Sequence, residues 1–416
     1  MAIPMATTTD MENGGSSRLR SWFGGDRVIW ILLVALCAAS TVLVYSAASN
    51  QLISPTERHN LLPYVRSHIL FLLIGVGVAA LVQHVDYRRL APFSRLCYLL
   101  AVLVLVLTLA LGKNTGGVQR SITFFGREIQ TFYMVVLLMI VYMAHAVARF
   151  GPRINDIRRV YIPFLLLVGA VSVGLMSQNV STGGILMMVC LFILFVSELK
   201  LRYWLATIGV FLAILLLLVV TSGFGIRQLD RFQTAHARME RFLDKGDEKE
   251  VRLRVAEMND DAVDNIRQDV LLEGAVSTGG FVPVNGPGGS IFNTTPQIYS
   301  DCIFALAVEE YGVILSSLLL LLYLILFYRV FLMLQHVPTP FGVYLAGGLG
   351  FWIVFQAMVH ISVCVGVIPN TGQTLPMISW GNVSIMVTSV CFGLLLNISK
   401  SKKKSEKRQM KGVENE

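Results

Sequence analysis

The ionisable residues best placed to do chemistry stand at the start of one apolar run. Asp301 precedes this run in the sequence SDCIFALAVEEYG, and Glu309 and Glu310 lie within it. A charged side chain at membrane depth costs a few kcal/mol, so each is a candidate functional residue. On a helix both glutamates lie about 12 Å from Asp301, Glu309 about 80° round and Glu310 on the opposite face. The three carboxylates are therefore expected to be separate groups.

Asp301 fits two roles that the residues alone leave open. At the outer rim of a membrane its carboxylate can take a proton from a hydroxyl, as a general base does. Asp before an apolar helix can instead accept hydrogen bonds from the first free amides as an N-cap. For Glu309 and Glu310, the alternative to chemistry is pairing with polar groups inside a bundle of helices.

Two other segments carry candidate groups. Cations of the loop 113–130 suit a pyrophosphate or, equally simply, lipid headgroups; they are Lys113, Arg120 and Arg127. The segment 367–382 is interrupted by helix breakers, namely Pro369, Gly372, Pro376 and Gly381. At membrane depth such backbone is tolerated only where it is buried in protein or lines a cavity, and an ordinary loop is the alternative. His360 is expected to make an interhelical hydrogen bond.

The composition places these residues in a membrane protein. Of 416 residues, 55% are hydrophobic and 14% are charged, whereas soluble domains carry about 25% charged residues. The six cysteines have no paired spacing, which excludes a disulfide scaffold and a zinc site. The net charge of +8 lies mainly in short loops and a basic C-terminal tail, a pattern that indicates a membrane surface and not nucleic acid.

Apolar runs predict an all-α polytopic membrane protein, because a spanning helix needs about 20 apolar residues. We identify ten candidate transmembrane helices: 28–48, 67–85, 94–112, 131–148, 160–177, 182–197, 203–221, 302–334, 341–368 and 377–398. The loops on one side of the membrane carry more Lys and Arg than the other side, and both tails join the richer side. Both termini are therefore predicted to be cytoplasmic.

The spans divide the chain into five parts. A cytoplasmic tail, 1–26, is expected to be disordered, and 27–221 holds helices one to seven. A large extracytoplasmic loop occupies 222–301, followed by helices eight to ten over 302–398 and a basic cytoplasmic tail over 399–416.

The large loop has two halves of different composition. Spaced charges over 227–267 predict amphipathic surface helices, and the sequence GGFVPVNGPGGS over 279–290 predicts turns. Because this second half abuts Asp301, we expect 279–300 and 367–379 to form the two walls of a substrate cavity.

Several motifs follow one another in order through the C-terminal half of the chain. They are Gly279-Gly280, Gly286-Pro287-Gly288 with Ser290, Asp301 with Ile303-Phe304-Ala305, Glu309-Glu310-Tyr311-Gly312, Gln356-Ala357, Pro369, Thr371-Gly372, Leu375-Pro376, Ile378-Ser379 and Gly381. At these residues the sequence resembles the SEDS family (shape, elongation, division and sporulation) of ten-helix peptidoglycan glycosyltransferases. It is most similar to the division-type members, through Thr-Gly-Gln-Thr-Leu-Pro at 371–376.

The resemblance implies a set of site residues. Asp301 falls on the essential catalytic aspartate of the family. Substrate-binding positions would be Arg120, Gly280, Gly288, Ser290, Glu309, Gln356, Thr371, Gly372, Pro376 and Ser379. The chain departs from the family at the start of the fourth helix, where Thr131, Phe132, Tyr133 and Val136 replace Pro-Ser-Glu and a lysine, and at His360, where asparagine is common.

The resemblance also implies a reaction and partners. The chain would polymerise lipid II, the undecaprenyl-linked disaccharide-pentapeptide, with inversion and with undecaprenyl pyrophosphate as the leaving group. Cations such as Arg120, or a divalent metal (Mg or Mn), would neutralise the pyrophosphate. A class B penicillin-binding transpeptidase and other divisome membrane proteins would be its partners in the inner membrane at the division septum.

Other classes of function fit part of the same evidence. Ten helices with broken segments and intramembrane carboxylates also suit a lipid II flippase or transporter. The missing motif of the fourth helix suits a non-catalytic scaffold of the division machinery. Within the family, an elongation-type polymerase is the alternative to a division-type one.

Overall fold

The computed structural model describes most of the membrane-embedded part of the chain. It describes residues 24–51, 61–115, 118–124, 127–222, 275–276, 278–282, 286, 289, 299–369 and 371–413. Several predictions lie outside these residues: the disorder of the N-terminal tail up to residue 23, the surface helices over 227–267, and the placement of Gly288 and Ser290.

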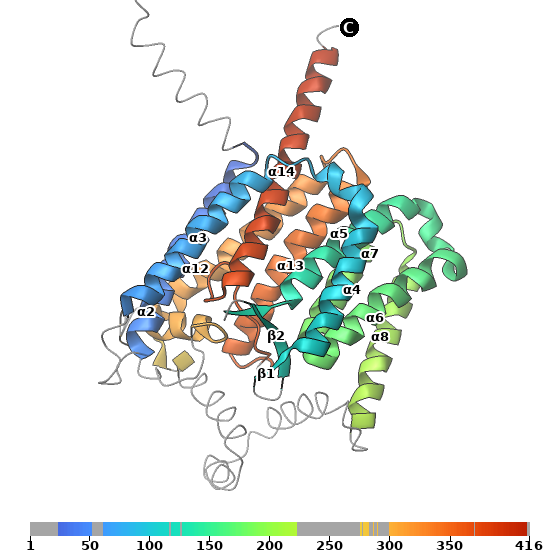
Figure 1. Cartoon of the computed structure of the whole chain (residues 1–416). Helices are drawn as coiled ribbons and strands as arrows, with labels where there is room; N and C mark the ends of the chain where they lie inside the picture. Colours follow the sequence, from blue (N-terminus) through green and yellow to red (C-terminus); the bar gives the residue numbers. More distant parts are fainter. Residues whose placement is uncertain are drawn as a thin grey trace, which may run out of the picture.

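The described fold is a bundle of apolar helices, as predicted (Figure 1). They are α2 (Arg27–Gln51), α3 (Leu61–Val82), α4 (Ser94–Leu111), α5 (Phe132–Phe150), α6 (Ile162–Gln178), α7 (Val180–Val196), α8 (Leu201–Ser222), α12 (Ile303–Leu334), α13 (Pro340–Cys364) and α14 (Asn382–Val413). Among the described residues, 8 helical segments are long and apolar enough to cross a membrane, and two shorter apolar helices, α7 and the first part of α8, accompany them. The all-α membrane fold is confirmed, and the count of ten spans stays a prediction.

Short polar side chains fix where several helices begin. Asp86 accepts a hydrogen bond of 3.0 Å from the Arg88 amide at the start of the 3-10 helix η2 (Tyr87–Phe93). Asn179, in extended conformation, ends α6 and caps α7 by accepting from the Ser181 amide. Such caps pair amides that a helix leaves free in its first turn.

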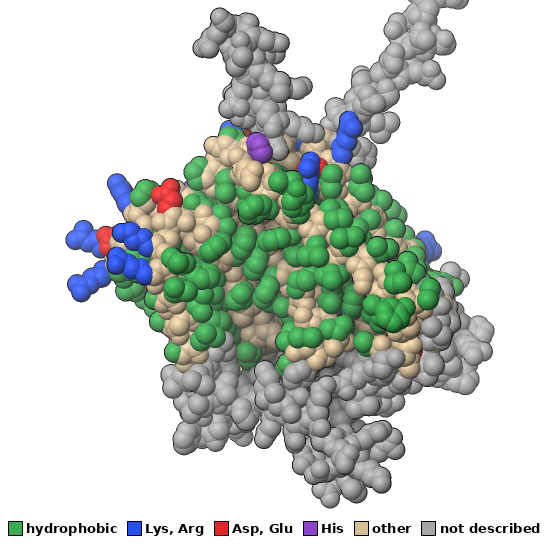
Figure 2. Space-filling view, turned by 180° about the vertical axis from the view of Figure 1, so that it is seen from behind, with side chains coloured by type: hydrophobic (Ala, Val, Ile, Leu, Met, Phe, Trp, Pro, Cys, Tyr) green, Lys and Arg blue, Asp and Glu red, His purple; other side chains and the backbone are tan. Residues whose placement is uncertain are grey.

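Two helices form the centre of the bundle. In the membrane-spanning part of α13, 72% of the residues are buried, and in that of α14, 78% are buried. The corresponding share in α3 is 22%. Helix α13 packs on α12, α5 and α7, and α14 packs on α3. The outer helices present apolar side chains to the lipid, and Figure 2 shows hydrophobic residues covering one flank, with Lys and Arg gathered at its margins.

The two ends of the bundle can be told apart by long-range contacts. The Asp26 carboxylate pairs with Arg329 at 2.5 Å, and the Asp26 amide donates to Ser399 at 2.9 Å. The Tyr87 amide donates to Asn397 nearby on α14. Asp301 lies at the opposite end, because α14 runs about 25 Å from its start to Ser399. The end of the bundle that contains Asp26 and Ser399 is the end predicted to face the cytoplasm.

The predicted loop 113–130 contains regular structure that the sequence analysis did not anticipate. Strands β1 (Lys113–Thr115), β2 (Val118–Phe124) and β3 (Arg127–Gln130) form an antiparallel sheet in the order β1-β2-β3. Its register pairs Ser121 with Gln130. The β-branched and aromatic residues of VQRSITF favour a strand. The sheet lies at the Asp301 end, with β2 against α4 and α6.

Residues 279–282 and 286 of the large loop, here called the strap, pack against a kink in α12. The kink is at Gly312, where φ is 75°. The Val313 amide donates to the Gly280 carbonyl at 3.0 Å, and the Gly286 amide donates to the Glu310 carbonyl at 3.1 Å. A Cβ on Gly312 would lie 2.8 Å from the carbonyl carbon of Val282. Only glycine therefore fits both the left-handed backbone and the close approach of the strap.

We expect Gly312→Ala to destabilise the protein by about 1–3 kcal/mol, because the substitution meets both the strained φ and the strap backbone. The melting temperature of the detergent-purified chain measures this effect. Gly77→Ala on α3 is the matched control, since a Cβ there meets nothing within 4 Å and alanine favours a helix. Equal melting temperatures for the two variants would contradict the assignment of the strap.

Candidate functional site

The site is organised by an irregular segment, 371–381, that connects α13 to α14 inside the bundle. Five of its carbonyls accept hydrogen bonds of 2.5–3.1 Å from side chains elsewhere. The donor and acceptor pairs are Asn179 to Thr371, His360 to Gln373, Gln356 to Thr374, Tyr323 to Pro376 and Ser40 to Ile378. The donors come from α2, α12, α13 and the junction of α6 with α7. Irregular backbone is thus buried in protein, as its position in a membrane requires.

The conformation of this segment corrects one predicted boundary. The sequence predicted a helix from residue 377, but α14 begins at Asn382. Met377 has a φ of 64°, and Gly372 has a φ of 62°, so the backbone reverses direction instead of continuing as a helix. The apolar composition of 377–380 hid this turn from the hydrophobicity pattern.

A polar network joins the segment to α5. The Tyr133 hydroxyl is hydrogen bonded to the Thr374 hydroxyl, and Ser384 lies 3.2 Å from the same Thr374 oxygen. The Gln356 amide lies 3.5 Å from the Tyr133 oxygen. Tyr133, which entered the sequence analysis only as a departure from the family motif, is therefore a central member of the site.

Hydrogen bonding fixes the tautomers of two buried histidines. His360 must carry its proton on Nδ1, because the Gln373 carbonyl 2.7 Å away can only accept. His360 is therefore hydrogen bonded as expected, but its acceptor lies in the irregular segment and not on another helix. Ser40 donates its only proton to Ile378, so His68 Nε2, 2.8 Å away, must donate to Ser40. The His68 ring also stacks on Trp380 with centroids 5.9 Å apart.

Asp301 is attached to the end of the irregular segment. The Ser379 hydroxyl accepts from the Leu375 amide and donates to the Ser300 carbonyl at 2.6 Å, and the Trp380 amide donates to the Tyr299 carbonyl at 2.9 Å. The Asp301 carboxylate is half-buried and accepts from the Ser300 hydroxyl at 2.8 Å.

The surroundings of Asp301 bear on its two possible roles. The N-cap position of α12 belongs to Cys302, so Asp301 stands one residue outside the helix. It interacts electrostatically with Tyr133 on α5 and with Cys364 on α13. Its carboxylate therefore acts electrostatically on Tyr133, which belongs to the polar network around Thr374.

The two glutamates lie apart from this layer, as helical geometry predicted. Both are 0% exposed, and the Ser46 hydroxyl of α2 donates to the Glu310 carboxylate. The strap residues Gly279 and Gly280 lie at the same depth, since a Cβ on Gly279 would meet the Val308 carbonyl at 2.5 Å. Glu310 fits the alternative of pairing inside the bundle.

The structure brings together only part of the predicted set. One layer holds Asp301, Gln356, Thr371, Gly372, Pro376 and Ser379. Gly280 and Glu309 lie apart from this layer, and Gly280 lies beside the kink of α12, where its carbonyl accepts from the Val313 amide. Arg120 stands on β2 at the same end of the bundle as Asp301, and its side chain is outside the described part of the chain. The predicted wall 279–300 is described only at its ends.

Some buried polar groups of this layer have no hydrogen-bond partner within the described residues. They are both amide atoms of Gln373, the Thr371 hydroxyl, the Asn382 carbonyl oxygen and the Gln178 amide nitrogen. Gln373 is only 2% exposed. Leaving such a group unpaired costs about 1–3 kcal/mol, so these atoms are the ones in this layer with capacity to pair with water or a polar ligand.

Sequence reasoning missed several residues that hold the site together. Ser40, His68, Asn179 and Tyr323 were not singled out, although each is a polar residue in or beside an apolar run. His68 is also ionisable, and the rule that led to Glu309 would have found it. The others gave no signal because their acceptors are distant in sequence.

The described residues offer no ready site for a resident metal ion. Within the described part of the chain, no three His, Cys, Asp or Glu side chains gather as a ligand set. A divalent cation at this site would have to take most of its oxygen ligands from water or from another molecule.

The fold and the site define a multi-pass helical membrane protein with a buried irregular segment beside a carboxylate, and comparison with known proteins agrees with this fold. The FtsW/RodA/SpoVE family model, described as a cell cycle protein, matches residues 26–404. The chain therefore belongs to the FtsW/RodA/SpoVE family, also called SEDS.

Individual relatives share about a quarter of the sequence. The "Probable peptidoglycan glycosyltransferase FtsW" of Coxiella burnetii is 25% identical over 378 residues, which cover 89% of this chain and 95% of the relative. Stage V sporulation protein E of Bacillus subtilis is 26% identical over 386 residues, covering 90% and 97%. A chain from the structure "Structural coordination of polymerization and crosslinking by a peptidoglycan synthase complex" has a TM-score of 0.68 at 22% identity, covering 91% of this chain and 98% of that chain.

We expect Tyr323→Phe to lower the free energy of unfolding by about 1–3 kcal/mol, because the substitution removes the hydrogen-bond donor to the buried Pro376 carbonyl and keeps the ring. Thermal unfolding of the purified chain measures the loss. Tyr328→Phe is the control on the same helix, since Tyr328 is 62% exposed. A Tyr323→Phe protein as stable as the control would show that this carbonyl finds another partner.

Proposed function

We propose that this chain is a peptidoglycan glycosyltransferase that polymerises lipid II at the outer face of the cytoplasmic membrane during cell division. The observation that carries the proposal is the position of Asp301. It is half-buried, outside the α12 N-cap position, and attached through residues 299 and 300 to a layer whose polar atoms include several without a partner among the described residues. Family membership and the names of the relatives support the same activity.

The proposed reaction is a single displacement with inversion. Asp301 takes the proton from a hydroxyl of the acceptor GlcNAc, whose oxygen forms a bond to the anomeric carbon of the lipid-linked donor. The bond from that carbon to the pyrophosphate breaks, and undecaprenyl pyrophosphate leaves with the electron pair. One carboxylate is sufficient for this chemistry, unlike the two carboxylates of glycosidases.

The unpaired polar groups of the layer suit a sugar and its peptide. Gln373 can both donate and accept through its amide, and the Thr371 hydroxyl can do the same. Backbone near Gly372 is close by and carries no Cβ there. We assign these groups, with Ser379 and Gln356 as supports of the segment, to holding the substrate in reach of Asp301.

The leaving group requires positive charge at the outer end of the bundle. We assign this role to Arg120 on β2, supported by other cations of the loop 113–130. A divalent cation, Mg or Mn, would arrive with the pyrophosphate, because the described residues provide no ligand cluster. Stabilising developing charge in this way is a major part of catalysis in many enzymes.

The setting of the reaction follows from topology and relatives. Both termini are assigned to the cytoplasm by the distribution of basic loop residues, which places Asp301 on the outer side. A transpeptidase of the penicillin-binding class is the partner, in line with the synthase complex to which the fold is similar. Division at the septum, with other divisome membrane proteins and not elongation, is supported by the Thr-Leu-Pro sequence at 374–376 and by the FtsW relatives.

We expect Asp301→Asn to lower polymerisation of purified lipid II by about 10²–10⁴-fold, the usual contribution of a general base. Gel analysis of glycan strands measures the rate. Asp86→Asn is the control, because Asp86 lies at the opposite end and asparagine also caps helices well. Glycan strands made at the wild-type rate by Asp301→Asn would refute the proposal, and flipping of labelled lipid II without polymer would favour a transporter.

Replacing the proposed pyrophosphate cation is expected to slow the reaction as well. Arg120→Gln should lower the rate about a hundredfold, because a charge that meets the leaving group is lost, while Arg158→Gln at the other end should not. Chelation by EDTA should also lower the rate of the wild-type chain, and Mg or Mn should restore it. An unchanged rate after chelation would show that protein cations are sufficient.

A further inference from the structure

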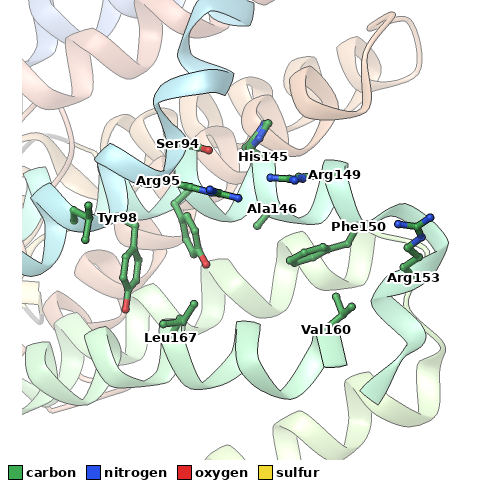
Figure 3. A pocket seen from close by; sticks show the side chains of 12 residues that line it. Ser94, Arg95, Tyr98, His145, Ala146, Arg149, Phe150, Arg153, Val160 and Leu167 are labelled. Carbon is green, nitrogen blue, oxygen red and sulfur yellow. The ribbon is translucent and has the colours of Figure 1, made fainter. Parts of the chain in front are cut away.

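A pocket lies at the opposite end of the bundle from Asp301. It has a volume of about 660 Å³ and is formed between α4, α5, α6 and the short turns that connect α5 to α6 (Figure 3). Its lining includes Arg95, Tyr98, His145, Arg149 and Leu167. A pocket of this size is in the range of small-molecule sites.

The lining changes from cationic to apolar along the helices. Arg95 begins α4 and Leu99 follows about 6 Å deeper, while on α5 Tyr142 lies about 10 Å deeper than Arg149. Figure 3 shows Arg95, Arg149 and His145 near one another, with Tyr98 and Leu167 farther along the pocket. The charges therefore stand at the level of headgroups and the apolar residues at the level of acyl chains.

The cations of the pocket are not neutralised within the described part of the chain. Arg153, on the 3-10 turn η3 (Gly151–Asn155), adds a third guanidinium to those of Arg95 and Arg149. Among the described residues that line the pocket there is no Asp or Glu, and no ion pair of these three arginines is found within the described residues. The His145 ring interacts electrostatically with Arg95 and Arg149, so the positive charges converge on one region.

The pocket is open to the bilayer. Leu99 is 63% exposed and Leu167 is 40% exposed, so an acyl chain can enter from the side, between α4 and α6. Its distance from the reaction site is large, because Tyr133 and Arg149 are about 24 Å apart along α5. The pocket is therefore separate from the lipid substrate site proposed at the outer face.

We propose that this pocket binds an anionic phospholipid of the cytoplasmic leaflet. The phosphate of the lipid pairs with Arg95 and Arg149, with Arg153 at the margin, and an acyl chain lies along Tyr98, Leu99 and Leu167. Guanidinium groups match phosphate geometry in a bidentate manner, and basic pockets between membrane helices on this side suit acidic headgroups. The apolar half of the pocket favours a lipid over free phosphate, which shares the headgroup chemistry.

The test is native mass spectrometry of the full-length chain titrated with dioleoyl phosphatidylglycerol, dioleoyl phosphatidylcholine or inorganic phosphate. We expect phosphatidylglycerol to be retained most strongly. Arg149→Gln should weaken its apparent affinity about fivefold, and Arg95→Gln with Arg149→Gln about twenty-five-fold, which corresponds to about 1 kcal/mol for each basic residue. Leu167→Trp should also weaken retention, because the ring fills the apolar half while every charge is kept.

Arg158→Gln is the matched control, since Arg158 is exposed at the same end and does not line the pocket. The melting temperature of each variant is measured without added lipid, and only variants that melt at the wild-type temperature are compared, so that misfolded proteins are left out. Equal retention of the two phospholipids, a loss in Arg158→Gln as large as in Arg149→Gln, or full retention by Leu167→Trp would overturn the proposal. Competition by inorganic phosphate at the lipid's own concentration would show a free-anion site instead.

Discussion

The structure depends on the pairing of backbone carbonyls in one irregular segment inside a membrane protein. Unpaired carbonyls in a hydrocarbon environment cost several kcal/mol each, and residues 373–379 of this segment are buried. Side chains from several helices meet the requirement, from Ser40 on α2 to Tyr323 on α12 and Gln356 on α13. The helices therefore fix the shape of 371–381, and the segment in turn fixes the relative positions of the helices.

The same constraint explains where binding capacity remains. The segment's carbonyls are largely paired by the protein, whereas the Gln373 amide and the Thr371 hydroxyl are not paired within the described residues. Asp301 is joined to this layer through Ser379 and Trp380, which bind the backbone of residues 299 and 300. The proposed base and a set of polar atoms that lack partners among the described residues are thus held by one frame. Such preorganisation is what a displacement reaction requires, because the reacting groups must be held in line.

The sequence was informative where a local signal existed. Long apolar runs located the helices within a few residues, and the ordered motifs pointed to Asp301 before any geometry was available. It was uninformative where a role depends on contacts between distant residues: Tyr133 and Thr374 are 241 positions apart in the chain. Composition also misplaced the start of α14, since Met377 and Ile378 are as apolar as the helix that follows. The cationic pocket was invisible for the same reason, because its arginines belong to three different elements, the start of α4, the end of α5 and the turn η3.

Helix α5 links the two ends of the molecule. Tyr133 at its first turn belongs to the polar network, and Arg149 at its last turn lines the cationic pocket. The helix is uninterrupted between them and packs on α13 and α7. A ligand shifts a conformational equilibrium only by its difference in affinity for two states. A lipid bound at Arg149 would stabilise this arrangement of the bundle only if it bound another arrangement less tightly. Helix α5, which is buried along much of its length, is the element that would carry such an effect to Tyr133 beside the segment 371–381.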